Sequence, residues 1–196
     1  MYSLPESYIS NPENDFFDDT SLTDAYQKEV YEHARRVADR ERLCRVIDIG
    51  CGSAYKLIKN FEGFDTIGID LPPTVEWLKK TYPKRTWIES NFDTTLQVSG
   101  LVIASDVIEH LPDPDRLMAF VRRLRAGGVI VLSTPERARL KHLQTEWREQ
   151  GPPVNPAHVR EWSFDEFESY VGSWFSVEEH FISNESQGTQ LIVARP

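Results

Sequence analysis

The chain has 196 residues, 40% of them hydrophobic and 11% aromatic, which is enough for one domain with a sizeable core. Its 31 acidic residues outnumber 22 Lys and Arg, and the resulting net charge of −9 repels polyphosphate, so no nucleic-acid partner is expected. No apolar run approaches the roughly 20 residues of a membrane span, the first residues do not resemble a signal peptide, and the two cysteines make no disulfide framework. We therefore expect a cytoplasmic protein without a membrane partner.

Two N-terminal segments precede the first strand pattern. Residues 1–21 are rich in Asn, Asp, Ser, Pro and aromatic residues without periodicity, so they either lack order or fold over a ligand; we expect a lid. Residues 22–41 have the apolar spacing of a helix. Its apolar positions are Leu22, Ala25, Tyr26, Val30, Ala34 and Val37. This divides the chain into an N-terminal lid segment and helix, residues 1–41, and a ligand-binding domain, residues 42–196.

A glycine turn follows the first predicted strand, residues 45–49. The strand leads into Gly50-Cys51-Gly52, and a helix pattern over 53–61 comes next, with apolar residues at the i, i+3, i+4 and i+7 positions. Glycines lack the Cβ atom that keeps a ligand away from the backbone. The helix N-terminus adds N–H groups and the positive end of the helix dipole. Such a corner predicts a nucleotide-type ligand.

The residues around the turn separate two classes of ligand. A dinucleotide fingerprint, G-x-G-x-x-G, needs a third glycine where this chain has Tyr55, so a nicotinamide cofactor is disfavoured. The pattern Asp48-x-Gly50-x-Gly52 instead resembles motif I of the class I S-adenosylmethionine (SAM)-dependent methyltransferases. In that family the turn holds the methionine part of SAM. The resemblance implies cofactor contacts from Asp48, Gly50, Cys51 and Gly52.

Two further strand ends extend the expected cofactor site. The strand over 65–69 is followed by Asp70, whose carboxylate can accept hydrogen bonds from ribose hydroxyls, and by Leu71, which can lie against the adenine. After the strand over 86–89, the family places backbone N–H groups and an acid near the adenine amine. The resemblance implies that Asn91, Phe92 and Asp93 fill these roles, while ordinary turn-forming roles remain open for each of them.

The fourth and fifth strands carry the remaining family signals. The strand over 101–105 leads into a segment that resembles the corresponding one in small-molecule O- and N-methyltransferases, including those of ubiquinone biosynthesis. That segment reads Ser105-Asp106-Val107-Ile108-Glu109-His110-Leu111. The resemblance implies that Ser105, Asp106 and Val107 contact the cofactor. A helix over 113–125, a glycine turn and a strand over 128–133 follow, and residues 157–163 resemble a late segment of the same enzymes.

Strands that alternate with helices predict a parallel sheet built from βαβ units. The two last strand patterns, 174–183 and 188–194, flank a turn and predict an antiparallel hairpin. The expected fold is therefore α/β, a Rossmann-like, doubly wound, mostly parallel seven-stranded sheet with a C-terminal antiparallel hairpin. Residues 136–162 interrupt this order with a charged, helix-compatible stretch over 136–150 and a proline-rich loop. We expect them to be a substrate-recognition insertion.

Two histidines are candidate catalytic bases, His110 after the fourth strand and His158 in the late segment. For each, a structural role in shaping the pocket remains an alternative. No metal site is predicted, because Asp106, Glu109 and His110 would need further acids on a later loop that offers only Glu136.

These observations predict SAM-dependent methyl transfer to a small-molecule acceptor, with S-adenosylhomocysteine (SAH) as the product. O-methylation of a hydroxyl is the favoured reaction. N-methylation of a small amine or amino sugar is an alternative, and a non-catalytic SAM- or SAH-binding module serving a partner protein is another. The acceptor, the pathway and the oligomeric state stay open.

Overall fold

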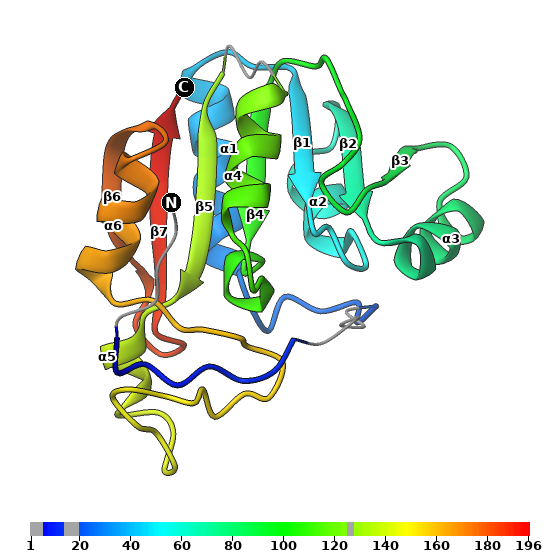
Figure 1. Ribbon diagram of the computed structural model, residues 1–196. Helices are drawn as coiled ribbons and strands as arrows, with labels where there is room; N and C mark the ends of the chain where they lie inside the picture. The colour runs from blue at the N-terminus through cyan, green and yellow to red at the C-terminus, as the bar shows by residue number, and fades with distance from the viewer. Residues whose placement is uncertain (1–5, 14–19, 125–127) are drawn as a thin grey trace.

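The computed structural model describes residues 6–13, 20–124 and 128–196, and its core is one seven-stranded sheet in the order β3-β2-β1-β4-β5-β7-β6 (Figure 1). The strands are β1 (Arg45–Ile49), β2 (Asp65–Asp70), β3 (Thr86–Glu89), β4 (Leu101–Ser105), β5 (Ile130–Pro135), β6 (Ser176–Asn184) and β7 (Thr189–Arg195). The helices are α1 (Lys28–Arg40), α2 (Tyr55–Asn60), α3 (Pro72–Thr81), α4 (Asp115–Arg123), α5 (Arg137–Leu140) and α6 (Phe164–Gly172), with a 3-10 turn η1 (Ile108–His110).

Strands β1 to β5 pair in parallel, and β7 is antiparallel to both β5 and β6. This confirms the predicted fold class, including the C-terminal hairpin. The strand order reverses between β1 and β4, which lie side by side although β2 and β3 separate them in the chain. In open α/β sheets such a reversal leaves a crevice at the carboxyl ends of the strands, where ligands bind.

The sheet is buried on both faces because alternate residues of each strand pack into different helical layers. In β4, Val102 and Ala104 pack with the apolar residues of α4 and α6, while Leu101 and Ile103 pack with those of α1. Figure 1 shows α4 and α6 in front of the sheet and α1 behind it. Parallel strands buried on both faces have continuous apolar sequences, as β4 does.

Two predicted helices differ from the observed ones. The helix expected over 22–41 begins at Lys28, because Gln27 adopts a left-handed conformation with φ of 62°. Leu22 and Tyr26 therefore lie outside the helix and are 56% and 65% exposed. In the stretch 136–150, only Arg137–Leu140 is helical, and the side chain of Glu136 caps its first N–H groups.

A buried carboxyl joins α1 to the sheet. The hydroxyl of Tyr31 on α1 lies 2.9 and 3.1 Å from the two carboxyl oxygens of Asp48 on β1, and both residues are inaccessible to solvent or nearly so. Burial raises the pKa of Asp48 to about 7, although the hydrogen bond from Tyr31 and the charge of Lys56 both act in the opposite direction. The contact thus positions α1 at the cost of desolvating an acid.

The pKa of Asp48 predicts a pH-dependent stability. The folded protein keeps this proton to a higher pH than the unfolded chain does, so the free energy of unfolding falls as pH rises from about 4 to about 7 and is then constant. Asp48→Asn removes the ionisation and keeps an acceptor for Tyr31. We expect the variant to lose this slope and to be more stable than the wild type above pH 7, by up to about 4 kcal/mol.

Denaturant unfolding of the protein without ligand, from pH 4.5 to 8, measures this difference. Asp39→Asn is the control, because Asp39 is an exposed acid on α1, the helix that carries Tyr31. If the free energies of unfolding of Asp48→Asn and the wild type change with pH in the same way, the raised pKa of Asp48 is contradicted.

Candidate active site

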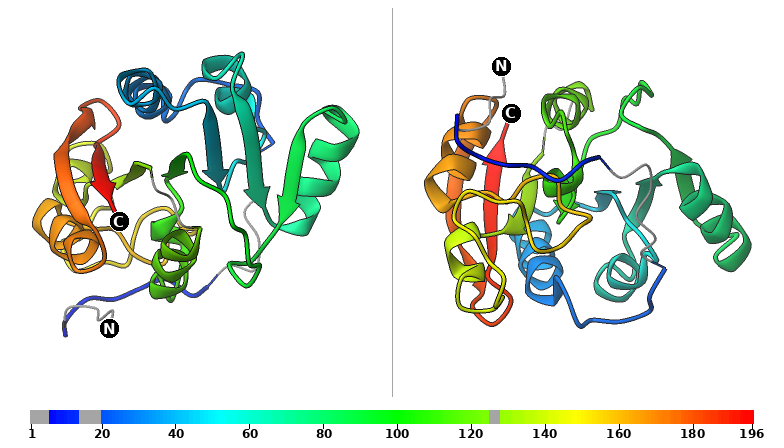
Figure 2. Two further views of the ribbon diagram at one scale, coloured as in Figure 1. Left: turned by 90° about the horizontal axis from the view of Figure 1, so that it is seen from above. Right: turned by 60° about the horizontal axis from the view of Figure 1, so that its bottom comes forward.

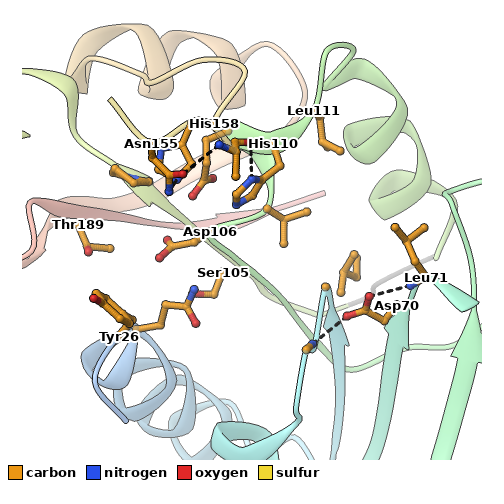
Figure 3. A pocket seen from close by; sticks show the side chains of 18 of the residues that line it. Tyr26, Asp70, Leu71, Ser105, Asp106, His110, Leu111, Asn155, His158 and Thr189 are labelled. Atoms are coloured by element: carbon orange, nitrogen blue, oxygen red, sulfur yellow. Dashed lines mark hydrogen bonds between the residues drawn. The ribbon is translucent and has the colours of Figure 1, made fainter. Parts of the chain in front are cut away.

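A cavity of about 1140 Å³ lies at the carboxyl ends of the parallel strands, where the strand order reverses (Figure 3). The turns after β1, β2, β3 and β4 form one part of its lining. The other part comes from Glu109 and His110 of η1, the loop before α6, residues 21–27 and the β6–β7 turn. The cavity therefore joins the predicted cofactor corner to the two later family-like segments and to residues 21–27 and the β6–β7 turn, which no family motif placed there.

The glycine turn packs tightly between two neighbouring strands. Gly50 and Gly52 have φ of 68° and 50°, conformations that favour glycine. The N–H of Gly50 donates to the Ile69 carbonyl at 2.8 Å, so the turn lies against β2. A Cβ atom on Gly50 would lie 2.5 Å from Cγ2 of Val107, in the turn after β4. No side chain fits at this position without moving the cavity wall.

Asp70 fixes the turn from the end of β2. One of its carboxylate oxygens accepts the N–H of Gly52 at 2.8 Å, and the other accepts the N–H of Leu71 at 2.7 Å, as the dashed lines in Figure 3 show. Asp70 is half-buried and lines the cavity. The carboxylate is thus held in place before any ligand contacts it, which the sequence pattern did not indicate.

The structure brings most of the predicted cofactor residues to the cavity. Those that line it are Gly50, Gly52, Asp70, Leu71, Asn91, Phe92, Ser105, Asp106 and Val107. The side chains of Asp48 and Cys51 are buried and are not part of the lining. Asp93 is also outside the lining; its carboxylate is exposed and pairs with Arg116 at 3.1 Å.

The acid after β4 is oriented by two serines. The hydroxyl of Ser133 on β5 donates to Asp106 at 2.7 Å and lies 2.9 Å from the hydroxyl of Ser105. Because the single proton of Ser133 is directed to Asp106, Ser105 is the donor to Ser133. This chain of hydrogen bonds fixes Asp106, which has φ of 53°, on the wall of the cavity.

Glu109 in η1 is inaccessible to solvent yet reaches the cavity lining. The hydroxyl of Thr134 donates to its Oε2 at 3.0 Å, while its Oε1 makes no hydrogen bond within the part of the chain that the structure describes. Burial raises the pKa of Glu109 well above its ordinary value. Its main-chain carbonyl accepts the N–H groups of Val159 and Arg160, and this contact ties η1 to the late loop.

The two candidate histidines lie beside each other, with ring centroids 5.0 Å apart (Figure 3). Nδ1 of His110 lies 2.8 Å from the carbonyl oxygen of Ala157. A carbonyl only accepts hydrogen bonds, so Nδ1 carries the proton and the lone pair of the neutral ring is on Nε2.

The hydrogen bonds of Asn155 and Glu161 determine the tautomer of His158. Oδ1 of Asn155 accepts the N–H of Ala157 at 3.0 Å, which turns the amide nitrogen of Asn155 toward Nε2 of His158 at 2.9 Å. Nε2 is therefore an acceptor, and Nδ1 carries the proton and faces Glu161 at 3.3 Å. Both rings thus direct Nδ1–H to an oxygen of the protein.

Residues 6–13 run along the loop that carries His158 (Figure 2). The N–H of Ile9 donates to the Gln150 carbonyl at 2.7 Å. The side-chain amide of Asn11 donates to three carbonyls, those of Pro153, Asn155 and His158, at 2.9 to 3.1 Å. The interpretation of the N-terminal segment as a lid stays a prediction, and residues 1–5 and 14–19 lie outside the described part.

Comparison with known proteins decides the family. A family model described as a methyltransferase domain matches residues 22–179, most of the chain. The chain belongs to this methyltransferase family. The resemblance inferred from Asp48, Gly50, Gly52 and the later segments is therefore confirmed, and so is the use of SAM as the methyl donor. The cavity fits that cofactor, because its glycine turn and its fixed Asp70 carboxylate meet at one edge.

Curated relatives are longer than this chain and match it over only part of their length. A probable SAM-dependent methyltransferase of Mycobacterium tuberculosis is 29% identical over 146 residues, which is 70% of this chain and 50% of that protein. A ribosomal protein L11 methyltransferase of Cupriavidus taiwanensis is 35% identical over 92 residues, 45% of this chain and 31% of that protein. The chain thus spans half or less of the length of these relatives.

Solved structures share the fold. The Streptomyces venezuelae protein DesVI superposes with a TM-score of 0.65 at 17% identity, covering 88% of this chain and 93% of that one. The methyltransferase domain of bacterial CtHen1 gives 0.62 at 24% identity, covering 87% and 98%. Magnesium protoporphyrin IX methyltransferase from Synechocystis, solved with SAH, gives 0.62 at 17% identity, covering 87% and 84%.

Among the described residues, no helix is long and apolar enough to cross a bilayer.

The close contact between Gly50 and Val107 yields a test with a matched control. Gly50→Ala adds a Cβ to a left-handed residue and into Val107, whereas Gly63→Ala adds one to a left-handed residue with nothing within 4 Å. The backbone cost, about 1–2 kcal/mol, is common to both. We expect only Gly50→Ala to lose SAM affinity, by tenfold or more, and to be the less stable of the two. Calorimetric titration with SAM and denaturant unfolding measure both effects; equal SAM affinities would contradict the role of the turn.

Proposed function

We propose that the methyltransferase acts on a hydroxyl group of a small-molecule acceptor. The observation that supports this most directly is that His110 and His158 line the same cavity as the glycine turn. One end of the cavity has the glycines and Asp70, and the other has the two imidazoles, so cofactor and acceptor can occupy it together. When bound, SAM supplies a methyl group on a positively charged sulfur.

The cofactor end is assigned as follows. The N–H groups of the Gly50–Gly52 turn face the methionine part, and the buried side chains of Asp48 and Cys51 pack beneath the turn. The carboxylate of Asp70 accepts the ribose hydroxyls, and Leu71 and Phe92 flank the adenine. Asn91 offers backbone contacts there, and Ser105, Asp106 and Val107 form the wall after β4. Asp93 acts indirectly, through its ion pair with Arg116.

At the acceptor end, the protein has to align the acceptor oxygen with the methyl group and remove its proton. Nε2 of His110 carries a lone pair directed to act on the hydroxyl, whereas Nε2 of His158 accepts the amide N–H of Asn155 and has to release it before it can act. Tyr26 and Leu143 add exposed apolar surface to the same cavity, being 65% and 47% exposed. This supports an acceptor with an apolar portion beside the reacting hydroxyl.

N-methylation of an amine remains the second candidate, because the carboxyl of Asp106 lines the cavity and can hold an amine. The ordered histidine pair favours the hydroxyl, since an amine lone pair attacks without a base. A non-catalytic SAM-binding module has no need for a histidine pair at the cofactor cavity.

Asp70→Ala tests the cofactor end. The substitution removes a charged acceptor from both the ribose and Gly52, and hydrogen bonds to charged groups contribute about 1.5–3 kcal/mol. We expect SAM affinity to fall by about one to two decades. Asp65→Ala is the matched control, because it removes an exposed acid at the opposite end of the same strand, outside the cavity lining. Calorimetry that gives equal affinities for the two variants would refute this placement of the ribose.

His110→Ala tests the reaction. SAH release is measured with a panel of hydroxyl-bearing and amine-bearing acceptors, and the variant is then compared with the wild type in single turnovers. We expect turnover with a hydroxyl acceptor, a loss of roughly two to four decades in rate for His110→Ala, and unchanged SAM affinity. His142→Ala, at an exposed histidine outside the cavity, is the control.

Three results would contradict the proposal. Turnover with amines alone would favour N-methylation. SAM binding without turnover on any acceptor would favour a non-catalytic module. A His110→Ala variant as fast as the wild type would remove the histidine pair from the chemistry.

A further inference from the structure

We propose that Glu109, His110 and His158 form a binding site for one divalent transition-metal ion at the acceptor end of the cavity. Each residue offers one ligand atom, and the three atoms all lie within 4.8 Å of one another. The ligand set considered from the sequence was Asp106, Glu109 and His110, and it did not include His158, which is 48 residues after His110. The contact between the Glu109 carbonyl and the N–H groups of Val159 and Arg160 brings them together.

The tautomers of both histidines fit metal binding. His110 directs Nδ1–H to the Ala157 carbonyl, and His158 directs Nδ1–H to the Glu161 carboxylate. Metal-binding histidines generally donate one ring N–H to a carbonyl or carboxylate in this way, which orients the ring and leaves the other nitrogen as the ligand. Here that nitrogen is Nε2 in both rings.

The third ligand is a buried carboxyl with an unpaired oxygen. Glu109 is inaccessible to solvent, and its Oε1 makes no hydrogen bond within the described part of the chain, whereas Thr134 binds Oε2. A buried polar atom without a partner costs about 1–3 kcal/mol. A cation between Oε1 and the two imidazoles supplies that partner.

Binding requires a small rearrangement. The amide of Asn155 donates to Nε2 of His158, so the ion has to displace it. Ligand atoms about 2.0–2.2 Å from a metal ion lie roughly 3–3.5 Å from one another, so the cluster also has to contract. We expect rotation of the Glu109 and Asn155 side chains to supply both movements.

Two imidazoles and one carboxylate select the class of ion. Ca²⁺ and Mg²⁺ prefer oxygen ligands, whereas Zn²⁺ and Co²⁺ bind imidazole well. Three protein ligands leave positions open to the cavity, as in catalytic metal sites. We therefore assign the site to Zn²⁺ or an ion of similar chemistry.

The chemical role of the ion rests on the proposed O-methylation. An acceptor hydroxyl bound at an open position becomes more acidic, and its proton passes to water in the cavity. The acceptor oxygen then forms the bond to the methyl carbon as the carbon–sulfur bond breaks, and SAH leaves. The histidines act on the hydroxyl through the metal ion in this scheme.

Metal titrations of the full chain, stripped with a chelator, test the site without SAM or acceptor. We expect one Zn²⁺ per chain, weaker binding of Mg²⁺, and a Co²⁺ absorption spectrum typical of nitrogen ligands. Glu109→Gln, His110→Ala and His158→Ala should each weaken Zn²⁺ binding by tenfold or more, whereas His142→Ala should not. Thermal unfolding of each variant establishes that it is folded, and the Co²⁺ spectrum of the wild type is an independent readout.

Zn²⁺ binding tests the metal site, and methylation of a hydroxyl acceptor tests the proposed function, so the two can fail separately. Absence of Zn²⁺ binding, or affinity unchanged in all three variants, refutes the metal site; O-methylation that is unaffected by the chelator then leaves His110 as a direct base. Stoichiometric binding that depends on the three residues supports the site even if no hydroxyl acceptor is methylated, a result that would count against the proposed function alone.

Discussion

The close approach of two chain turns, one after β1 and one after β4, is the constraint on which the rest of the site depends. These strands are neighbours because the strand order reverses between them, so their carboxyl-end turns face each other. Val107 leaves room at Gly50 for a hydrogen atom only. This contact sets the position of the turn after β4, and of η1 that follows it, relative to the glycine turn.

Three acids around the cavity accept hydrogen bonds before any ligand enters. Asp70 is held by Gly52 and Leu71, Asp106 by Ser133, and one oxygen of Glu109 by Thr134. Each partner comes from an adjacent strand or turn, so the site is preorganised by the sheet itself. Groups that are already in position do not have to move during the reaction. They can therefore hold the bound reactants in alignment.

Much of the fold followed from the sequence because it depends on local patterns. Apolar strands and the glycine turn gave the parallel sheet, and the hairpin residues gave its antiparallel edge. The predicted start of the first helix, residue 22, was wrong. The apolar spacing over 22–26 is that of a helix, but these residues form an irregular segment that borders the cavity. The capping box of Ser163 and Glu166, an S-x-x-E signal visible in the sequence, marks the beginning of α6 and was overlooked.

The candidate site was less accessible to sequence reasoning, since its contacts join distant segments. Nothing near Asp93 indicated that Arg116 would pair with it and hold it outside the cavity lining. The tautomers of His110 and His158 depend on Ala157, Asn155 and Glu161, whose positions only the folded chain determines.

Assembly from distant segments also assigns different tasks to the two ends of the cavity. The cofactor end consists of strand termini, whose positions the hydrogen-bonded ladder fixes. The proposed acceptor end consists of η1, the loop that carries His158 and the β6–β7 turn, and residues 6–13 hold that loop through Asn11. Irregular segments accept changes of sequence more readily than a ladder does. Acceptor selectivity is therefore expected to reside in these segments, while the strand ends preserve the binding of one cofactor.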